Sequence, residues 1–326
     1  MSKQQIEKDA QGYSPSTIED LASRTVDSDA SFLKPYIKPS DHILDVGCGP
    51  GTITCGFSML IDSTKGGYVI GIDSSMDTIQ RAREMAKERV PATIQLGNGN
   101  GHITSSSFGN GATIQFMKED ILDRLPFVSG AFSVIYANQM FRHLPTVRHR
   151  TAALKEMRRM LKPGGILATR DVAELHFYPP RCELDGIWAA RMAHLRCRKQ
   201  EDVCLPGGNM PVQFRAAGFG KRDDEDDNNN GGGNAAEVEY DQFGAPLPRP
   251  ELATSDSGKV ILGGGGDGAH GSRDGRLQSG ERFRESWRRA GITDEEVQET
   301  VKALEEWAED EDAWYVALQV EMLAWK

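Results

Sequence analysis

Short apolar runs alternate with amphipathic stretches between residues 42 and 172, and this alternation is the main structural signal of the chain. The apolar runs predict buried strands, at residues 42–46, 68–73, 113–117, 132–137 and 166–169. Helices are predicted between them, at residues 52–61, 76–89 and 152–161. Strands that alternate with helices in this way indicate an α/β fold with a doubly wound, parallel sheet.

The pattern becomes helical after residue 172. Apolar positions at helical spacing predict helices at residues 182–199, at 211–217 and from 280 to 326. We expect these helices to pack on the sheet as a cap. The chain then divides into an N-terminal segment (1–40), a core domain (41–220), an insertion (221–272) and a C-terminal helical cap (273–326).

Two polar, glycine-rich stretches interrupt this organisation. Residues 97–111 predict a lengthened surface loop, since such loops tolerate insertion at little cost in stability. Thirteen of the 35 glycines fall in residues 220–275, where apolar side chains are few. Burial there is too small to offset the entropy lost on ordering, so we expect residues 221–272 to be mostly disordered.

Charge is as unevenly spread as glycine. The chain of 326 residues has a net charge of −10, yet residues 293–312 and 221–234 together carry −12. The rest is close to neutral, which excludes a strongly basic nucleic-acid-binding protein. Within the acidic stretch, Val297, Val301 and Leu304 recur at helical spacing after a candidate N-cap, Thr293, so we expect an amphipathic helix with a solvated acidic face.

The five cysteines form no CxxC pair and no Cys/His cluster at zinc spacing. We therefore expect free thiols in a reducing compartment and no metal site. The first residues are polar, and no run approaches the ~18 apolar residues that cross a bilayer. The sequence thus predicts a cytoplasmic protein without stable membrane insertion.

The richest local motif is DVGCGPG, residues 45–51, directly after the first strand. Its glycines permit a tight turn and leave room for a ligand against the backbone. The G-x-G-x-G spacing lacks the third glycine of a dinucleotide-binding G-x-G-x-x-G turn. Asp73 ends the second strand, where a carboxylate can accept hydrogen bonds from both hydroxyls of a ribose, while Ser74 and Ser75 are better placed to cap the next helix.

The motifs DVGCGPGTIT, VIGIDSS, KEDI, LPF, FSVIYANQ and LKPGGIL follow one another in the order found in class I S-adenosylmethionine-dependent methyltransferases. They most resemble the branch related to the ubiquinone/menaquinone-biosynthesis C-methyltransferases, over most of residues 13–220 and 280–326. The resemblance implies a Rossmann-like, seven-stranded sheet with a helical cap, S-adenosylmethionine as cofactor and a small-molecule methyl acceptor. Ser133 departs from the family, which usually has an acidic residue there.

The resemblance also implies a role for each matching position. Asp45 and the turn would approach the methionine part of the cofactor, Asp73 the ribose, Asp120 the adenine, and Asn138 the reacting methyl group. Tyr13 and Arg24 would fold over the cofactor, or lie on the surface of a loose N-terminal segment. The implied cofactor-binding residues are Asp45, Gly47, Cys48, Gly49, Gly51, Asp73, Ser74, Met76, Asp120, Ile121, Asn138, Gln139, Tyr13 and Arg24.

Methyl transfer from a sulfonium is an in-line displacement that needs a general base only when the acceptor starts protonated. His143 is the first candidate for that base, or else a histidine in the turn before Pro145. His176 and Tyr178 would contact substrate or brace the cap. Two alternatives remain open on the sequence: an NAD-dependent oxidoreductase of the same fold, and a non-catalytic module that binds a partner through its cap or acidic helix.

Overall fold

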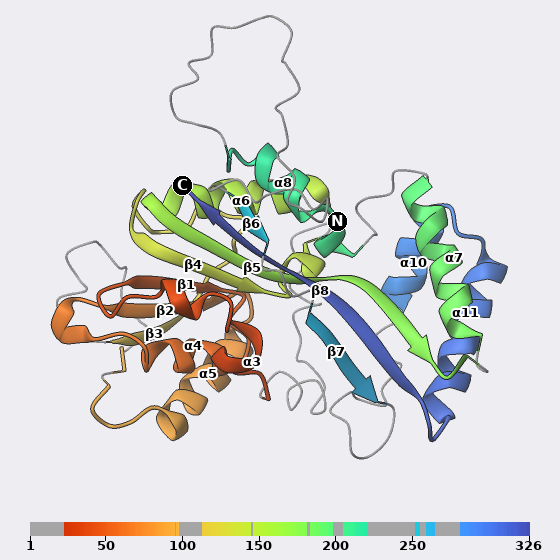
Figure 1. Cartoon of the computed structure of the whole chain (residues 1–326), viewed down its shortest axis with the longest axis horizontal. Helices are drawn as coiled ribbons and strands as arrows, with labels where there is room; N and C mark the ends of the chain where they lie inside the picture. Colours follow the sequence, from red (N-terminus) through yellow and green to blue (C-terminus); the bar gives the residue numbers. More distant parts are fainter. Residues whose placement is uncertain are drawn as a thin grey trace, which may run out of the picture.

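The computed structural model describes residues 23–94, 96–97, 113–144, 146–180, 183–197, 205–220, 252–254, 259–264 and 281–326. Its centre is a mixed sheet with the strand order β3-β2-β1-β4-β5-β8-β6, in which β7 also pairs with β8 (Figure 1). The strands are β1 (His42–Val46), β2 (Tyr68–Asp73), β3 (Ile114–Lys118), β4 (Phe132–Asn138), β5 (Leu161–Tyr178), β6 (Leu252–Thr254), β7 (Lys259–Gly264) and β8 (Trp314–Trp325).

The first five strands are those that the sequence predicts, and they run parallel. The sheet of the described residues has eight strands, so the expected count of seven is not confirmed. Ser133, the departure in β4, keeps the strands joined: its hydroxyl accepts from the His42 N–H (2.9 Å) and contacts the His42 carbonyl oxygen (3.3 Å). The Ser133 hydroxyl therefore links β4 to β1 at this position.

Helices cover both faces of the sheet, because alternate side chains of each strand point to opposite sides. On one face α6 (Val147–Met160) and α8 (Met210–Ala216) pack over the central strands. On the other lie α3 (Val26–Asp29), α4 (Thr52–Ser58) and, over β2 and β3, α5 (Met76–Arg89) (Figure 1). The short 3-10 helices are η1 (Lys34–Tyr36), η2 (Ser63–Lys65), η4 (Phe141–His143) and η6 (Pro206–Asn209).

The expectation of helix throughout residues 280–326 is wrong at its end. Residues 314–325 form strand β8, which runs antiparallel to β5 along most of that strand's length. β5 is likewise far longer than the predicted 166–169. Apart from Gln319 and Glu321 the sequence WYVALQVEMLAW is apolar or aromatic, which suits a largely buried strand, and pairing with β5 satisfies its backbone hydrogen bonds.

Beyond the sheet centre, the outer halves of β5 and β8 carry a second apolar cluster. Here α7 (Leu184–Cys197), α10 (Glu281–Arg289) and α11 (Asp294–Glu309) pack together, and we call these helices with the outer halves of both strands the distal unit (Figure 1). Phe177 makes edge contacts with Trp188 and Trp307, both at 5.5 Å between ring centroids. The predicted N-cap of α11 is confirmed, since Thr293 and Glu296 form a capping box.

The two glycine-rich stretches fall mostly outside the described residues. Of the predicted loop 97–111, only Gly97 is described, and its N–H donates to the Ile114 carbonyl (2.8 Å). Of the segment 221–272, expected to be mostly disordered, the described parts are β6 and β7, which both pair with β8. No helix among the described residues combines the length and the apolar character that crossing a membrane requires.

Candidate functional site

The turn between β1 and α4 is held against the neighbouring strand by its own backbone. The N–H groups of Gly47 and Cys48 both donate to the Ile72 carbonyl, at 2.8 and 2.9 Å. Gly47, Gly49 and Gly51 all have positive φ, which L side chains rarely adopt. A Cβ added at Gly49 would meet nothing within 4 Å, whereas one added at Gly51 would approach Phe116 and Ala82 within 3 Å. The turn is therefore packed at Gly51 and open at Gly49.

Asp73 faces this open position from the end of β2. Its Oδ2 accepts from the Gly49 N–H (3.3 Å) and its Oδ1 from the Ser75 N–H (2.9 Å). Burial raises the pKa of the Asp73 carboxyl, and the two hydrogen bonds act in the opposite direction. Ser75 itself caps α5, as the sequence predicts. The carboxylate is thus fixed in orientation beside the open turn.

Asp45 lies deeper than Asp73. Its Oδ2 accepts a hydrogen bond from Thr54 Oγ1 (2.6 Å) and the side chain is buried. Loss of solvation raises the pKa of Asp45 to about 7, and the neighbouring charge of Asp73 adds to the shift. Asp45 therefore links the end of β1 to the first turn of α4, the two elements that flank the glycine turn.

The end of β3 continues the same edge. The Glu119 N–H donates to the Asp73 carbonyl (3.0 Å), which brings Asp120 and Ile121 next to the end of β2. Asp120 Oδ1 accepts from the Leu122 N–H (2.9 Å), while Ile121 is buried. Ser74 and Met76 are exposed at the start of α5. Most of the residues that the resemblance implies for the cofactor therefore meet at the carboxyl ends of β1 to β4, where open α/β sheets bind ligands.

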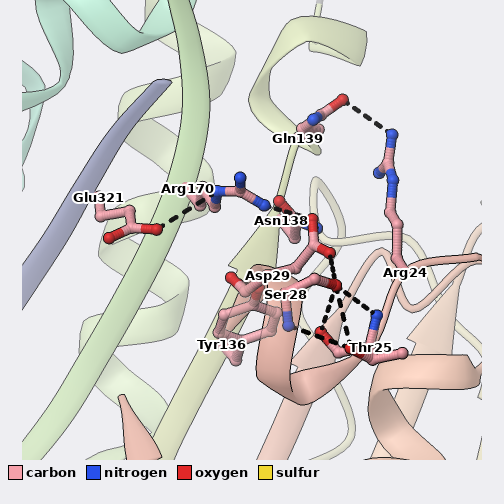
Figure 2. A network of polar contacts seen from close by, with 9 residues as sticks. All are labelled: Arg24, Thr25, Ser28, Asp29, Tyr136, Asn138, Gln139, Arg170 and Glu321. Atoms are coloured by element: carbon pink, nitrogen blue, oxygen red, sulfur yellow. Dashed lines mark hydrogen bonds and ion pairs between the residues drawn. The ribbon is translucent and has the colours of Figure 1, made fainter. Parts of the chain in front are cut away.

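Asn138 and Gln139 end β4 on the side toward β5. Gln139 has φ of 51°, a left-handed conformation that is strained for a residue other than glycine. Two contacts hold it: its N–H donates to the Arg170 carbonyl (2.7 Å), and Arg24 Nη2 donates to its side-chain oxygen (3.0 Å; Figure 2). Arg24 therefore contacts the end of β4, where its partner is Gln139.

A buried ion-pair group behind Asn138 was not predicted. Asp29 of α3 and Glu321 of β8 both contact the guanidinium of Arg170 in β5 (Figure 2). The available signal was the placement of Arg170 and Glu321 within otherwise apolar strands, since charged residues are almost never fully buried without partners. Which carboxylates pair with Arg170 depends on contacts across 141 and 151 positions of the chain.

The candidate catalytic side chains are not brought together. His143 is exposed in η4 after β4, whereas His176 and Tyr178 lie in the distal unit, six and eight residues beyond Arg170 along β5. At ~3.3 Å per strand residue, that is roughly 20 Å or more from the end of β4. There His176 lies 3.3 Å from a carboxylate oxygen of Asp185, and Tyr178 stacks on Trp314 at 4.3 Å.

One predicted residue and the expected absence of a metal site remain to be compared with the structure. Tyr13, predicted to fold over the cofactor, lies outside the described residues. Within the described ranges, no group of three or more histidine, cysteine or acidic side chains is arranged to hold a metal ion.

Replacing Gly51 with alanine tests how tightly the turn is packed. We expect a loss of about 2 kcal/mol in the free energy of unfolding, from left-handed strain together with overlap with Phe116 and Ala82. Gly66 is the matched control, since its φ of 84° is similar but nothing lies within 4 Å of an added Cβ. Its alanine variant is expected to lose about 1 kcal/mol. Equal losses in urea denaturation would show that the turn has room for a side chain.

A family model and several known proteins are similar to this chain. A family model described as a methyltransferase domain matches residues 44–169. A protein of Aspergillus luteorubrus, named probable methyltransferase ltbC, is 39% identical over 328 residues, which cover 97% of this chain and 96% of that protein. The ubiquinone/menaquinone biosynthesis C-methyltransferase UbiE of Neisseria meningitidis is 26% identical over 141 residues, 43% of this chain and 46% of that protein.

Among solved structures, the YcgJ protein of Bacillus subtilis aligns over 91% of this chain and 97% of its own, with a TM-score of 0.48 and 13% identity. The relative from Aspergillus matches nearly the whole chain, so the similarity is not confined to the glycine turn. The chain belongs to the class I S-adenosylmethionine-dependent methyltransferases, the family that its motifs resemble.

Proposed function

We propose that this protein binds S-adenosylmethionine and transfers its methyl group to a carbon or oxygen atom of a small-molecule acceptor. The observation that carries the proposal is the Asp73 carboxylate, held by two backbone N–H groups beside the open turn at Gly49. A carboxylate in this place suits the two hydroxyls of a ribose. The backbone of residues 47–51 then lies next to the methionine part of the cofactor.

The other residues of the edge take the roles that their positions allow. Asp120 and Ile121, beside Asp73, are assigned to the adenine, with Ser74 and Met76 at its exposed side. Asn138 and Gln139 are assigned to the end that carries the methyl group. The bound cofactor supplies an activated methyl donor, so the chain mainly needs to orient the acceptor and exclude water. For an acceptor that must lose a proton, His143 is the base we propose.

We assign the distal unit to the helical cap expected from the sequence. Its apolar cluster continues from β5, which pairs with β4, and from β8, which pairs with the other edge of β5. His176 and Tyr178 belong to this unit, so we assign them to bracing it.

Calorimetric titration with S-adenosylhomocysteine, and separately with NADH, tests the cofactor. We expect micromolar or tighter binding of S-adenosylhomocysteine and no binding of NADH, because the turn lacks the third glycine of the dinucleotide motif. The reverse result would favour the NAD-dependent alternative. A screen of metabolite extracts with cofactor carrying a labelled methyl group then identifies the acceptor by its labelled product.

A further inference from the structure

We propose that Asp29 and Arg170 are positioning residues for methyl transfer. Their side chains dock helix α3 on the ends of β4 and β5, and this docking holds Asn138 and Gln139 in place. The inference rests on the proposed function, because it assigns a purpose to the end of β4 where the methyl group would lie. We call the side chains of Arg24, Asp29, Asn138, Arg170 and Glu321 the docking network.

The contacts of the docking network converge on Asp29. Its Oδ1 accepts from Nη1 of Arg170 and from Nδ2 of Asn138 (3.3 Å). Its backbone carbonyl accepts from the Tyr136 hydroxyl (2.8 Å). Nε of Arg170 lies 3.4 Å from Oε1 of Glu321, so Arg170 joins α3 to β8 (Figure 2).

Buried charge explains why α3 and Arg24, two residues before it, must stay docked. The side chains of Asp29, Arg170 and Glu321 are 8%, 1% and 2% exposed, so two carboxylates share one guanidinium out of contact with water. Arg24, which is half-buried, adds a positive charge near Asp29: burial lowers the pKa of Arg24, and the charge of Asp29 acts in the opposite direction. Loss of Arg24 would remove one positive charge from beside Asp29, and an unbalanced buried charge is strongly destabilising.

The same network stabilises the strained end of β4. Arg24 holds the side chain of Gln139, and the Arg170 carbonyl holds its N–H. A left-handed residue other than glycine persists only where its surroundings enforce it. Release of α3 would remove Arg24 from Gln139 and Asp29 from Asn138 together. The residues assigned to the methyl end of the cofactor would then lose their fixed orientation, which docking supplies in advance of binding.

Asp29→Asn tests this role against a matched control, Asp27→Asn. Both substitutions remove one negative charge from α3, but Asp27 is exposed, and its ion-pair partner among the described residues is Lys34 at the surface. We expect Asp29→Asn to weaken S-adenosylhomocysteine binding about tenfold in calorimetry and to speed tryptic cleavage after Arg24, located by mass spectrometry. Asp27→Asn should leave both at the wild-type level, and Asp29→Glu should recover part of the affinity.

A second variant covers the case in which Asp29→Asn does not fold. Thr25→Val removes the capping box of α3 at an exposed position and leaves the buried charges intact. It should shift affinity and cleavage in the same direction, by a smaller factor. Wild-type affinity in Asp29→Asn, or in Thr25→Val if the former does not fold, would overturn the positioning role alone. A wild-type protein that does not bind S-adenosylhomocysteine would overturn the proposed function and this role with it.

Discussion

Asp73→Ala is expected to weaken the binding of S-adenosylhomocysteine about a hundredfold. The Asp73 carboxylate is oriented by the N–H groups of Gly49 and Ser75, so it is ready to accept from two ribose hydroxyls. Each hydrogen bond to a charged group contributes about 1.5–3 kcal/mol, and a loss of about 3 kcal/mol is roughly a hundredfold in the dissociation constant. Isothermal titration calorimetry measures the change directly.

Asp77→Ala is the matched control for this variant. Asp77 is an exposed carboxylate in the first turn of α5, so its removal changes the net charge equally. The alanine at position 73 also leaves two N–H groups without their acceptor, and the thermal midpoint therefore has to be recorded beside the affinity. If both variants bind as the wild type does, the ribose does not lie against Asp73.

Asp171→Asn is expected to stabilise the protein at alkaline pH. Burial raises the pKa of Asp171 to about 8, although Arg142 and Arg150 act in the opposite direction. The carboxyl of the unfolded chain titrates near pH 4, at about 3.9. Between these pKa values the Asp171 carboxyl is protonated in the folded state and ionised in the unfolded state. The contribution of Asp171 to the free energy of unfolding therefore falls as pH rises from about 4 to about 8. Asparagine has no such dependence.

Urea denaturation of the wild type and the variant at about pH 5 and about pH 9 measures the difference. The free energy of unfolding of Asp171→Asn, relative to that of the wild type, should increase by a few kcal/mol from about pH 5 to about pH 9, since each pKa unit corresponds to about 1.4 kcal/mol. Titration of Asp45 affects both proteins equally and cancels. Glu311→Gln, at an exposed carboxylate, should show no such growth. A constant difference between wild type and Asp171→Asn would mean that Arg142 and Arg150 keep Asp171 ionised in the folded protein.

The sequence by itself determined the parallel strands, the glycine turn and the place of Asp73. These features are local: apolar periodicity specifies buried strands, and positive φ at residues 47, 49 and 51 requires glycine. The Thr293 cap and the buried Val297, Val301 and Leu304 of α11 were predictable for the same reason. Each depends on residues within a few positions of one another.

Tertiary structure alone decided the rest. Residues 314–325 were predicted as helix and form β8. They do so because β5 has a long free edge, and the backbone N–H and carbonyl groups along it form hydrogen bonds with β8. The length of β5 also carries His176 and Tyr178 away from the end of β4. Asp29, Arg170 and Glu321 look like unrelated charges in the sequence, since the burial that makes them a network arises only when α3, β5 and β8 meet. Burial and long-range pairing depend on partners that local patterns do not specify.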